Sequence, residues 1–197
     1  MRAAPPAIEA EGSQPHCEIL GGLERTTVIK TNPVNAASAK TAAVLTISDS
    51  SYVGKREDLS GPTIVRALEA AQFKVVHTSI LPDEKDAIAA RLIECIELTR
   101  LVVTTGGTGI AVRDVTPEAT LSVIERRIAG VEEKMRQEGA KKTPFAALSR
   151  GICGVRGKTL LLNLPGSPSA AVESLQAVIG ILPHALELLD GKTDHGK

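Results

Sequence analysis

Short apolar runs alternate with segments of helical periodicity along most of the chain. Residues 43–47, 73–81 and 101–105 are apolar and rich in β-branched side chains, which is typical of buried strands. Between these runs, apolar residues recur three and four positions apart, and this spacing predicts helices that begin near Ser60 and soon after Pro82. We therefore expect strands and helices to alternate from about residue 41.

The second half of the chain continues this alternation. Thr116 is a good N-cap, and Pro117 fits a first helical position because its missing N–H has no partner there. Pro183 cannot donate a helical hydrogen bond, so a helix that reaches it should break or bend. The expected elements are helices over 117–128 and 131–139, strands over 151–155 and 158–164, and a long helix over 169–189.

This order of elements predicts an α/β fold with a mainly parallel sheet. Strands joined by helical crossovers lie parallel, and the helices then cover both faces of the sheet. The expected architecture is a three-layer α/β/α sandwich. In such sheets ligands bind at the carboxyl ends of the strands, so residues that follow a strand are candidates for a site.

The first 40 residues have a different character from the rest. They are rich in Ala, Pro, Ser, Gly and Asn, and only Arg25–Lys30 could form a short strand. We expect residues 1–40 to be an extension that is partly disordered or packs on a neighbour. The functional domain is expected over 41–190, followed by a tail over 191–197.

Composition excludes several functional classes. Lys and Arg together number 23, as do Asp and Glu, so no global field attracts nucleic acid or a membrane surface. Aromatic residues make up 2% of the chain, which leaves few platforms for stacking bases. Three scattered cysteines, no apolar leader and no run of membrane-spanning length favour a cytoplasmic protein.

Polar and glycine-rich turns follow the predicted parallel strands. Because carboxyl ends of parallel strands share one edge, these turns should meet there. Each acid also has a purely structural alternative: Asp49 and Asp83 could cap helices, and Asp114 could hold its own loop. The charged run 55–58 is expected to be solvated, although Lys55 or Arg56 could cover an anionic ligand. The turns are Ser48–Asp49, Asp83, Gly106–Gly109 with Asp114, and Asn163–Ser167.

Acids beside glycine turns suggest a magnesium-dependent reaction of phosphates. Backbone N–H groups and helix N-termini bind phosphate, whereas carboxylates repel it unless a divalent cation lies between them. No Ser-His-Asp or Cys-His arrangement offers a side-chain nucleophile, so substrate groups should react with each other, as in phosphoryl or nucleotidyl transfer. The segment 151–159 is similar to a P-loop, but it has one residue too many and leads into a strand.

Eight motifs resemble those of the molybdopterin adenylyltransferases, the MogA/MoaB-type proteins of molybdenum cofactor biosynthesis. The resemblance runs from about Thr41 to Leu189, and the combination of GGTG, RDVTPEAT and NLPGSP is specific. It implies a molybdopterin-binding α/β/α domain that assembles as a homotrimer or a hexamer. The motifs are TISDS (46–50), DLSGP (58–62), LPDE (81–84), TTGGTG (104–109), RDVTPEAT (113–120), MR (135–136), LSR (148–150) and NLPGSP (163–168).

The resemblance also implies a reaction and residue roles. Members of this family join molybdopterin and ATP to give adenylylated molybdopterin and pyrophosphate, with Mg²⁺, and other enzymes of molybdenum cofactor synthesis are expected partners. The alternative is a MoaB-like scaffold that binds molybdopterin without turnover. The implied roles are catalytic and metal-binding for Asp83 and Asp114; pterin- and phosphate-binding for Gly106, Gly107, Thr108, Gly109, Ser149 and Arg150; and nucleotide-binding for Ser48, Asp49, Asn163, Pro165, Gly166 and Ser167.

Overall fold

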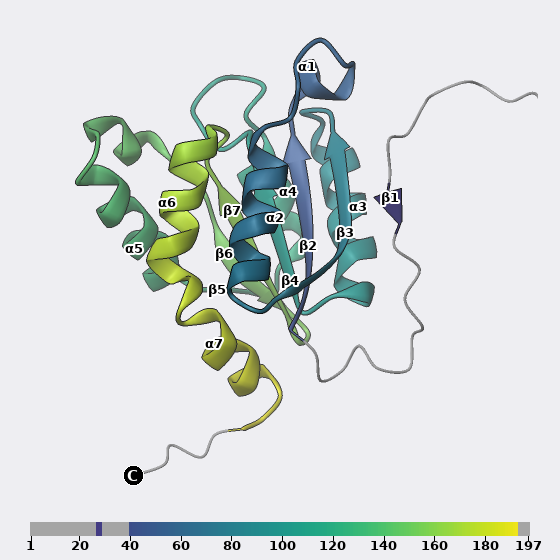
Figure 1. Ribbon diagram of the computed structural model, residues 1–197, viewed down its shortest axis with the longest axis vertical. Coiled ribbons are helices and arrows are strands. Elements are labelled where there is room, and N and C mark those ends of the chain that lie inside the picture. Colours follow the sequence, from purple (N-terminus) through teal and green to yellow (C-terminus); the bar gives the residue numbers. More distant parts are fainter. Residues whose placement is uncertain (1–26, 29–39, 193–197) are drawn as a thin grey trace, which may run out of the picture.

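A mixed sheet forms the middle layer of the protein (Figure 1). The computed structural model describes residues 27–28 and 40–192, and within them one seven-stranded sheet has the order β1-β3-β2-β4-β7-β6-β5. The strands are β1 (Thr27–Val28), β2 (Thr41–Ile47), β3 (Lys74–Leu81), β4 (Leu101–Thr105), β5 (Arg126–Arg127), β6 (Cys153–Arg156) and β7 (Thr159–Leu164).

The four central strands, β3, β2, β4 and β7, are mutually parallel. Their register aligns the carboxyl ends, since Ile47 pairs with Leu81 and Thr105 pairs with Leu164. The other strands, β1, β5 and β6, are antiparallel to their neighbours. The expected mainly parallel sheet is therefore confirmed, and the turns that follow the four parallel strands share one edge.

Helices cover both faces of the sheet, which confirms the α/β/α sandwich (Figure 1). Apolar side chains of α2, α5, α6 and α7 pack on one face, and those of α3 and α4 pack on the other. The helices are α1 (Asp49–Tyr52), α2 (Ser60–Ala70), α3 (Lys85–Leu98), α4 (Thr116–Val123), α5 (Ala129–Ala140), α6 (Pro168–Ile179), α7 (Leu182–Leu189) and the 3₁₀ helix η2 (Pro144–Leu148).

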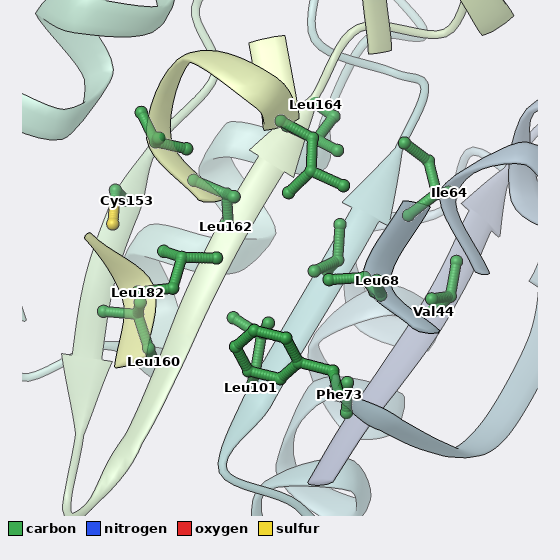
Figure 2. Packing of buried hydrophobic residues seen from close by; sticks show 14 of the residues in the cluster. Val44, Ile64, Leu68, Phe73, Leu101, Cys153, Leu160, Leu162, Leu164 and Leu182 are labelled. Atoms are coloured by element: carbon green, nitrogen blue, oxygen red, sulfur yellow. The ribbon is translucent and has the colours of Figure 1, made fainter. Parts of the chain in front are cut away.

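Every residue of β2, β4 and β7 is buried, so the sequences of these three strands are mostly apolar on both faces. In β7, Leu160, Leu162 and Leu164 face the layer that contains α6 and α7, where Leu182 of α7 lies beside them (Figure 2). Leu161 points to the opposite face and packs with the α3 and α4 cluster. Each fully buried leucine contributes about 1.5–3 kcal/mol to folding, and these clusters hold the edge that carries the turns.

Several predicted boundaries are corrected by the structure. Thr116 is the first residue of α4 and not its N-cap, because its hydroxyl donates to the Gly106 carbonyl (2.9 Å). The helix expected over 117–128 ends at Val123, and the chain then forms β5 as an edge strand. The long C-terminal helix breaks as expected from Pro183, into α6 and α7 at an angle of 57°.

The N-terminal expectations are mostly outside the described residues. Thr27–Val28 form the centre of the strand expected over Arg25–Lys30 and pair with β3. Residues 1–26 and 29–39 are not described, and the division into an extension, a domain and a tail stays a prediction. Within residues 27–28 and 40–192, no single helix could cross a membrane by length and composition, although α6 and α7 pass that test together as a bent pair.

Candidate functional site

A polar cavity of about 330 Å³ lies at the carboxyl edge of the parallel strands. Both predicted catalytic acids, Asp83 and Asp114, line it, and so do Gly106 and Gly107 of the glycine turn. The site therefore brings together residues that are far apart in the sequence. Its other lining residues come from the end of β2 and from the segments after β2 and β7, and they include Thr46, Ser48, Ser51, Arg56, Glu57, Asp58, Ser60, Gly166, Ser167 and Pro168.

Asp49 and Asp83 fix each other through reciprocal hydrogen bonds. The Asp49 N–H donates to Asp83 Oδ2 (2.8 Å), and the Asp83 N–H donates to Asp49 Oδ1 (3.0 Å). The guanidinium of Arg113 also donates to Asp49, at 2.8 Å, and to Glu84, at 2.8 Å. Three loops, which follow β2, β3 and β4, are thereby joined at the rim of the site.

These contacts give the two carboxyls different pKa values. The backbone N–H of Asp83 and the Arg113 guanidinium lower the pKa of Asp49 below its usual value. Burial raises the pKa of Asp83, and the charges of Asp49 and Asp114 add to the rise, against the Asp49 N–H and the Arg113 charge. Asp83 is thus partly buried with two other carboxyls nearby, and a bound cation would favour its charged form.

Asp114 holds its own loop, as its structural alternative proposed. Its Oδ2 accepts the Ala111 N–H (2.8 Å), and its N–H donates to the Ala111 carbonyl (2.9 Å). The same loop is held from outside by Arg150, which donates to the Gly109 carbonyl (2.6 Å), to the Asp114 carbonyl (2.5 Å) and to Glu118. Asp114 Oδ1 is not used by these bonds, so the side chain can hold the loop and face the cavity.

The structural alternative for Asp49 and Asp83, that each caps a helix, does not hold. The carboxylate of Asp83 makes no capping bond to α3, whose first residues have no side-chain cap. For α1, the side chain of Ser48 accepts the Ser51 N–H (3.2 Å), so Ser48 is the N-cap and Asp49 is the first helical residue. Neither acid is therefore explained by helix capping.

Asp58 is a site residue that the sequence reasoning assigned to a solvated run. It accepts hydrogen bonds from Thr46 Oγ1 (2.7 Å), Ser60 Oγ (3.2 Å) and the Gly61 N–H (3.0 Å) at the start of α2. The signal was present, because an Asp two residues before the predicted helix start at Ser60 can accept the N–H of the residue three positions after it, which is a capping pattern. Lys55 does not line the cavity, whereas Arg56 does.

The glycine turn presents free backbone donors. Gly106 has φ +103° and an added Cβ would lie 2.2 Å from the Ile47 carbonyl oxygen, so only glycine fits there. The Gly106 N–H donates to the Leu164 carbonyl, but the N–H groups of Gly107, Thr108 and Gly109 donate to no described residue. Three consecutive free amides form a cradle for an anion.

A second, more apolar cavity of about 320 Å³ adjoins the first. Gly166 lines both cavities, and an added Cβ there would lie 3.2 Å from the Gly106 Cα. The second cavity lies between α5, α6, η2 and the turn after β7. Its walls include Thr108, Gly109, Met135, Arg136, Phe145, Ala146, Leu148, Ser149, Gly151, Asn163, Pro165, Ala170, Glu173 and Ser174.

The residues that line each cavity do not match the pterin-binding and nucleotide-binding groups that the resemblance implies. Gly106 and Gly107 line the polar cavity, whereas Thr108, Gly109 and Ser149 line the apolar one. Of the residues predicted to bind nucleotide, Ser48 and Ser167 line the polar cavity. Asn163 and Pro165 line the apolar cavity.

Three predicted site residues have side chains that are held by other parts of the protein. Arg150 holds the Asp114 loop, and Asp49 holds Asp83 and Arg113. Asn163 is buried, and its amide donates to Thr104 and Thr120 (both 2.9 Å). These residues shape the site through the groups that they hold.

The histidine and cysteine side chains within the described residues do not add a second reactive site. No group of three His, Cys, Asp or Glu side chains among residues 27–28 and 40–192 is arranged to hold a metal ion. Burial raises the pKa of Cys95 and of Cys153 to about 12, so neither thiol is a nucleophile near neutral pH. His77 lies mid-strand and is buried, as predicted for a core histidine.

Comparison with known proteins identifies the family. The family model described as "Probable molybdopterin binding domain" matches residues 43–184. The chain belongs to this molybdopterin-binding family. The resemblance drawn from the motifs is thereby confirmed, and the matched residues include both cavities.

Relatives within the molybdopterin-binding family are similar over most of this chain. A molybdopterin adenylyltransferase of Helicobacter pylori is 42% identical over 152 residues, which cover 75% of this chain and 86% of the relative. The cinnamon protein of Drosophila melanogaster, a molybdenum cofactor synthesis protein, is 46% identical over 76% of this chain. That alignment covers 25% of cinnamon, so this chain spans about a quarter of its length.

Solved structures of the family share the fold. MoaB from Thermus thermophilus is 48% identical with a TM-score of 0.71, and the match covers 77% of this chain and 97% of that one. The Mog protein from Mycobacterium ulcerans is 34% identical with a TM-score of 0.73, covering 78% and 99%. The observed α/β/α sandwich is therefore the fold of the family.

Proposed function

We propose that this chain is a molybdopterin adenylyltransferase of molybdenum cofactor biosynthesis. It transfers AMP from ATP to the terminal phosphate of molybdopterin and releases pyrophosphate. Curated relatives from several bacteria that are 36–42% identical over most of the chain are named for this activity. The observation that carries the proposal is the pair of adjoining cavities, one acidic and one apolar, which meet at Gly166.

The polar cavity suits the triphosphate, and the apolar cavity suits the pterin ring. Ser48 and Ser167 offer hydroxyls in the polar cavity, beside Asp83 and Asp114. The free amides of Gly107, Thr108 and Gly109 lie where the cavities adjoin, so they can hold the phosphate of the pterin substrate against the nucleotide. Substrate positioning of this kind supplies a large part of the catalysis of phosphoryl and nucleotidyl transfer.

The acids of the polar cavity fit a magnesium ion. Burial raises the pKa of Asp83, the charges of Asp49 and Asp114 add to the rise, and a bound divalent cation would favour the charged form of this carboxyl. Magnesium in nucleotide sites is usually held by one or two carboxylates together with phosphates and waters, and Asp83 and Asp114 both line this cavity. Asp83 and Asp114 would hold the ion, and when bound it neutralises charge on the departing pyrophosphate.

The residues of this chain supply orientation and little proton chemistry. The terminal phosphate of molybdopterin is already an anionic nucleophile, so no general base is required. Asp49 and Arg113 position Asp83 and the Asp114 loop, and Arg150 holds that loop from the other side. A reaction between two bound phosphates depends on this rigidity, because small displacements cost large factors in rate.

The decisive variant is Asp114→Asn, assayed as magnesium-dependent pyrophosphate release from ATP and molybdopterin. Asparagine keeps an oxygen that can accept the Ala111 N–H, so the loop should hold while the charge is lost. We expect turnover to fall by about 10²–10³-fold with pterin binding within about threefold of the parent. The exposed Asp86→Asn variant in the first turn of α3 is the matched control and should keep full activity. Near-normal turnover of Asp114→Asn would contradict the metal-binding role.

A MoaB-like scaffold that binds molybdopterin without turnover is the second candidate. The 48% identity to a MoaB structure favours it. Absence of pyrophosphate from folded protein that binds molybdopterin would select this alternative. The acids of the polar cavity favour the enzyme, because a binder of polyphosphate gains nothing from carboxylates at its site.

The proposal includes a homotrimer or hexamer of the chain in the cytoplasm, and other enzymes of molybdenum cofactor synthesis as partners. Large apolar side chains on the described surface support an assembly. Val112 and Ile110 lie together in the loop after β4 and are 96% and 69% exposed, and neighbouring exposed apolar side chains are a candidate contact surface.

A further inference from the structure

The apolar cavity contains one acid without a protein partner, and this residue has no role in the mechanism above. Glu173 lies on α6, one turn after Ala170 and beside Ser174, and all three line the cavity. Its carboxylate makes no hydrogen bond or ion pair with any residue of the described part of the chain. A half-buried carboxylate on a mostly apolar wall is costly unless a ligand supplies donors.

The other charged groups of this cavity are already paired. Glu132 is fully buried, and Arg127 donates to both of its oxygens (2.8 and 2.7 Å) while the Cys153 N–H donates at 3.1 Å. Glu132 Oε2 also lies 3.7 Å from Arg136 Nη2, one turn along α5. Glu132 therefore holds the guanidinium of Arg136 at the cavity and has no capacity left for a ligand.

Arg136 is held loosely enough to bind a ligand as well. Its Nη1 donates to the Gly151 carbonyl at 3.4 Å, which is a long contact, and its side chain is 32% exposed. A guanidinium has five N–H donors, so several remain after these contacts. The packed helices α5 and α6 thus present a donor, Arg136, and an acceptor, Glu173, to the same cavity.

The polar edge of a pterin matches this pair. A 2-amino-4-oxopteridine presents an exocyclic amine and a ring N–H side by side, followed by a keto oxygen. A carboxylate accepts from both donors, and a guanidinium donates to the oxygen. Adenine presents a donor next to an acceptor, whose lone pair a carboxylate would repel. The ring that fits beside Glu173 is therefore the pterin and not the base of ATP.

We propose that Glu173 and Arg136 read the 2-amino-4-oxo edge of the pterin ring, and that Glu173 determines specificity for the 2-amino group. This assignment rests on the proposed function, since it names the groups that recognise one of its substrates. The remaining walls, formed by residues such as Met135 and Leu148, cover the faces of the ring. The cavity of about 320 Å³ is large enough for a small ring system.

The test compares 6-hydroxymethylpterin with 6-hydroxymethyllumazine, which carries a keto oxygen in place of the 2-amino group. Binding to the full chain is followed by quenching of the probes' own fluorescence. The parent protein should bind the pterin about 10–100-fold more tightly, as expected when a charged hydrogen bond is lost. In Glu173→Gln this preference should fall to about one or reverse, because the side-chain amide can donate to the keto oxygen.

Matched variants separate recognition from a general loss of structure. Glu187→Gln changes an exposed glutamate of α7, with a side chain 57% exposed, and should keep the preference. Arg136→Gln should weaken both probes alike, since both carry the 4-keto oxygen. Glu173→Asp keeps the charge and should keep the preference with weaker binding, so it serves if Glu173→Gln does not fold.

Three outcomes would overturn the assignment. They are a parent protein that binds neither probe, a parent that binds both equally, and a Glu173→Gln variant with an unchanged preference. Turnover of the parent with molybdopterin and ATP is measured in parallel. If turnover occurs but the preference does not depend on Glu173, the inference fails and the proposed function stands. If the preference shifts as expected but the parent shows no turnover, the assignment of Glu173 stands and the proposed transfer reaction fails.

Discussion

At the scale of single residues, Gly106 is the position where the backbone itself sets the site. It combines φ +103° with a contact that an added Cβ cannot make, 2.2 Å from the Ile47 carbonyl oxygen. We expect Gly106→Ala to lower the free energy of unfolding by at least about 3 kcal/mol, since backbone strain and overpacking add. Chemical denaturation measures the change.

Gly157→Ala is the control for this substitution. Gly157 also has a positive φ, +55°, but nothing lies within 4 Å of an added Cβ. Gly157→Ala should lower the free energy of unfolding by only about 1–2 kcal/mol, which is the cost of placing alanine in the left-handed conformation. Equal losses in the two variants would show that the close approach of Gly106 to β2 has no energetic weight.

His77 predicts a pH dependence of stability. Burial lowers the pKa of His77 on folding, and Nε2 has no partner among the described residues. A lowered pKa means that the unfolded chain binds the proton more readily. The contribution of neutral His77 to the free energy of unfolding is therefore fully present above the unfolded pKa of 6.5. It is lost as pH falls from there towards the lower pKa of the folded state.

The measurement is the free energy of unfolding of the parent and of His77→Gln between about pH 8 and pH 5. The parent should lose stability relative to the variant below about pH 6.5, by up to about 1.4 kcal/mol per pH unit. Parallel curves for the two proteins would show that His77 titrates alike in the folded and unfolded states.

At the scale of elements, Arg113 joins the loop after β4 to the segments after β2 and β3. Its side chain is 55% exposed, so its ion pairs with Asp49 and Glu84 should contribute little to stability, at most about 1 kcal/mol. The same contacts position Asp83 and Asp114. We therefore expect Arg113→Gln to leave the melting temperature within a few degrees and to lower kcat at least about tenfold.

Glu84→Gln distinguishes the two ion pairs of Arg113. The Glu84 side chain pairs with Arg113, whereas Asp49, the other partner of Arg113, is the residue bonded to Asp83, so the loss of Glu84 should reduce kcat less than the loss of Arg113. If both variants retain the kcat of the parent, the loops are held without Arg113 and its positioning role is wrong.

The elements also show how far the sequence could predict the site. The apolar runs of β2, β3, β4 and β7 carry strong local patterns, so the parallel sheet and the edge that gathers Asp83, Asp114 and the glycine turn could be predicted. These predictions need only strand order and direction, which short-range patterns and connection rules supply.

The rest depends on tertiary contacts that leave no local pattern. In the sequence, Glu132 is one of several charged residues on a helix of mixed charge. In the structure it is fully buried, because Arg127 and the backbone of β6 donate hydrogen bonds to it. Asp58 was assigned to solvent although it joins β2 to α2. The division of the glycine turn between two cavities likewise follows from the packing of α5 and α6, and not from the motif.

At the scale of the whole molecule, the two cavities adjoin at Gly166, and this arrangement has a kinetic consequence. The proposed product contains both a pteridine and an adenosine, so it would fill both chambers at once and gain from each attachment. Its departure should then be slower than its synthesis. Rapid-quench experiments should show a burst of about one pyrophosphate per site before a slower steady rate, whereas linear release from the first turnover would contradict this. A protein that releases its product slowly is suited to pass it directly to the next enzyme. Direct transfer would protect a labile intermediate from the surrounding water.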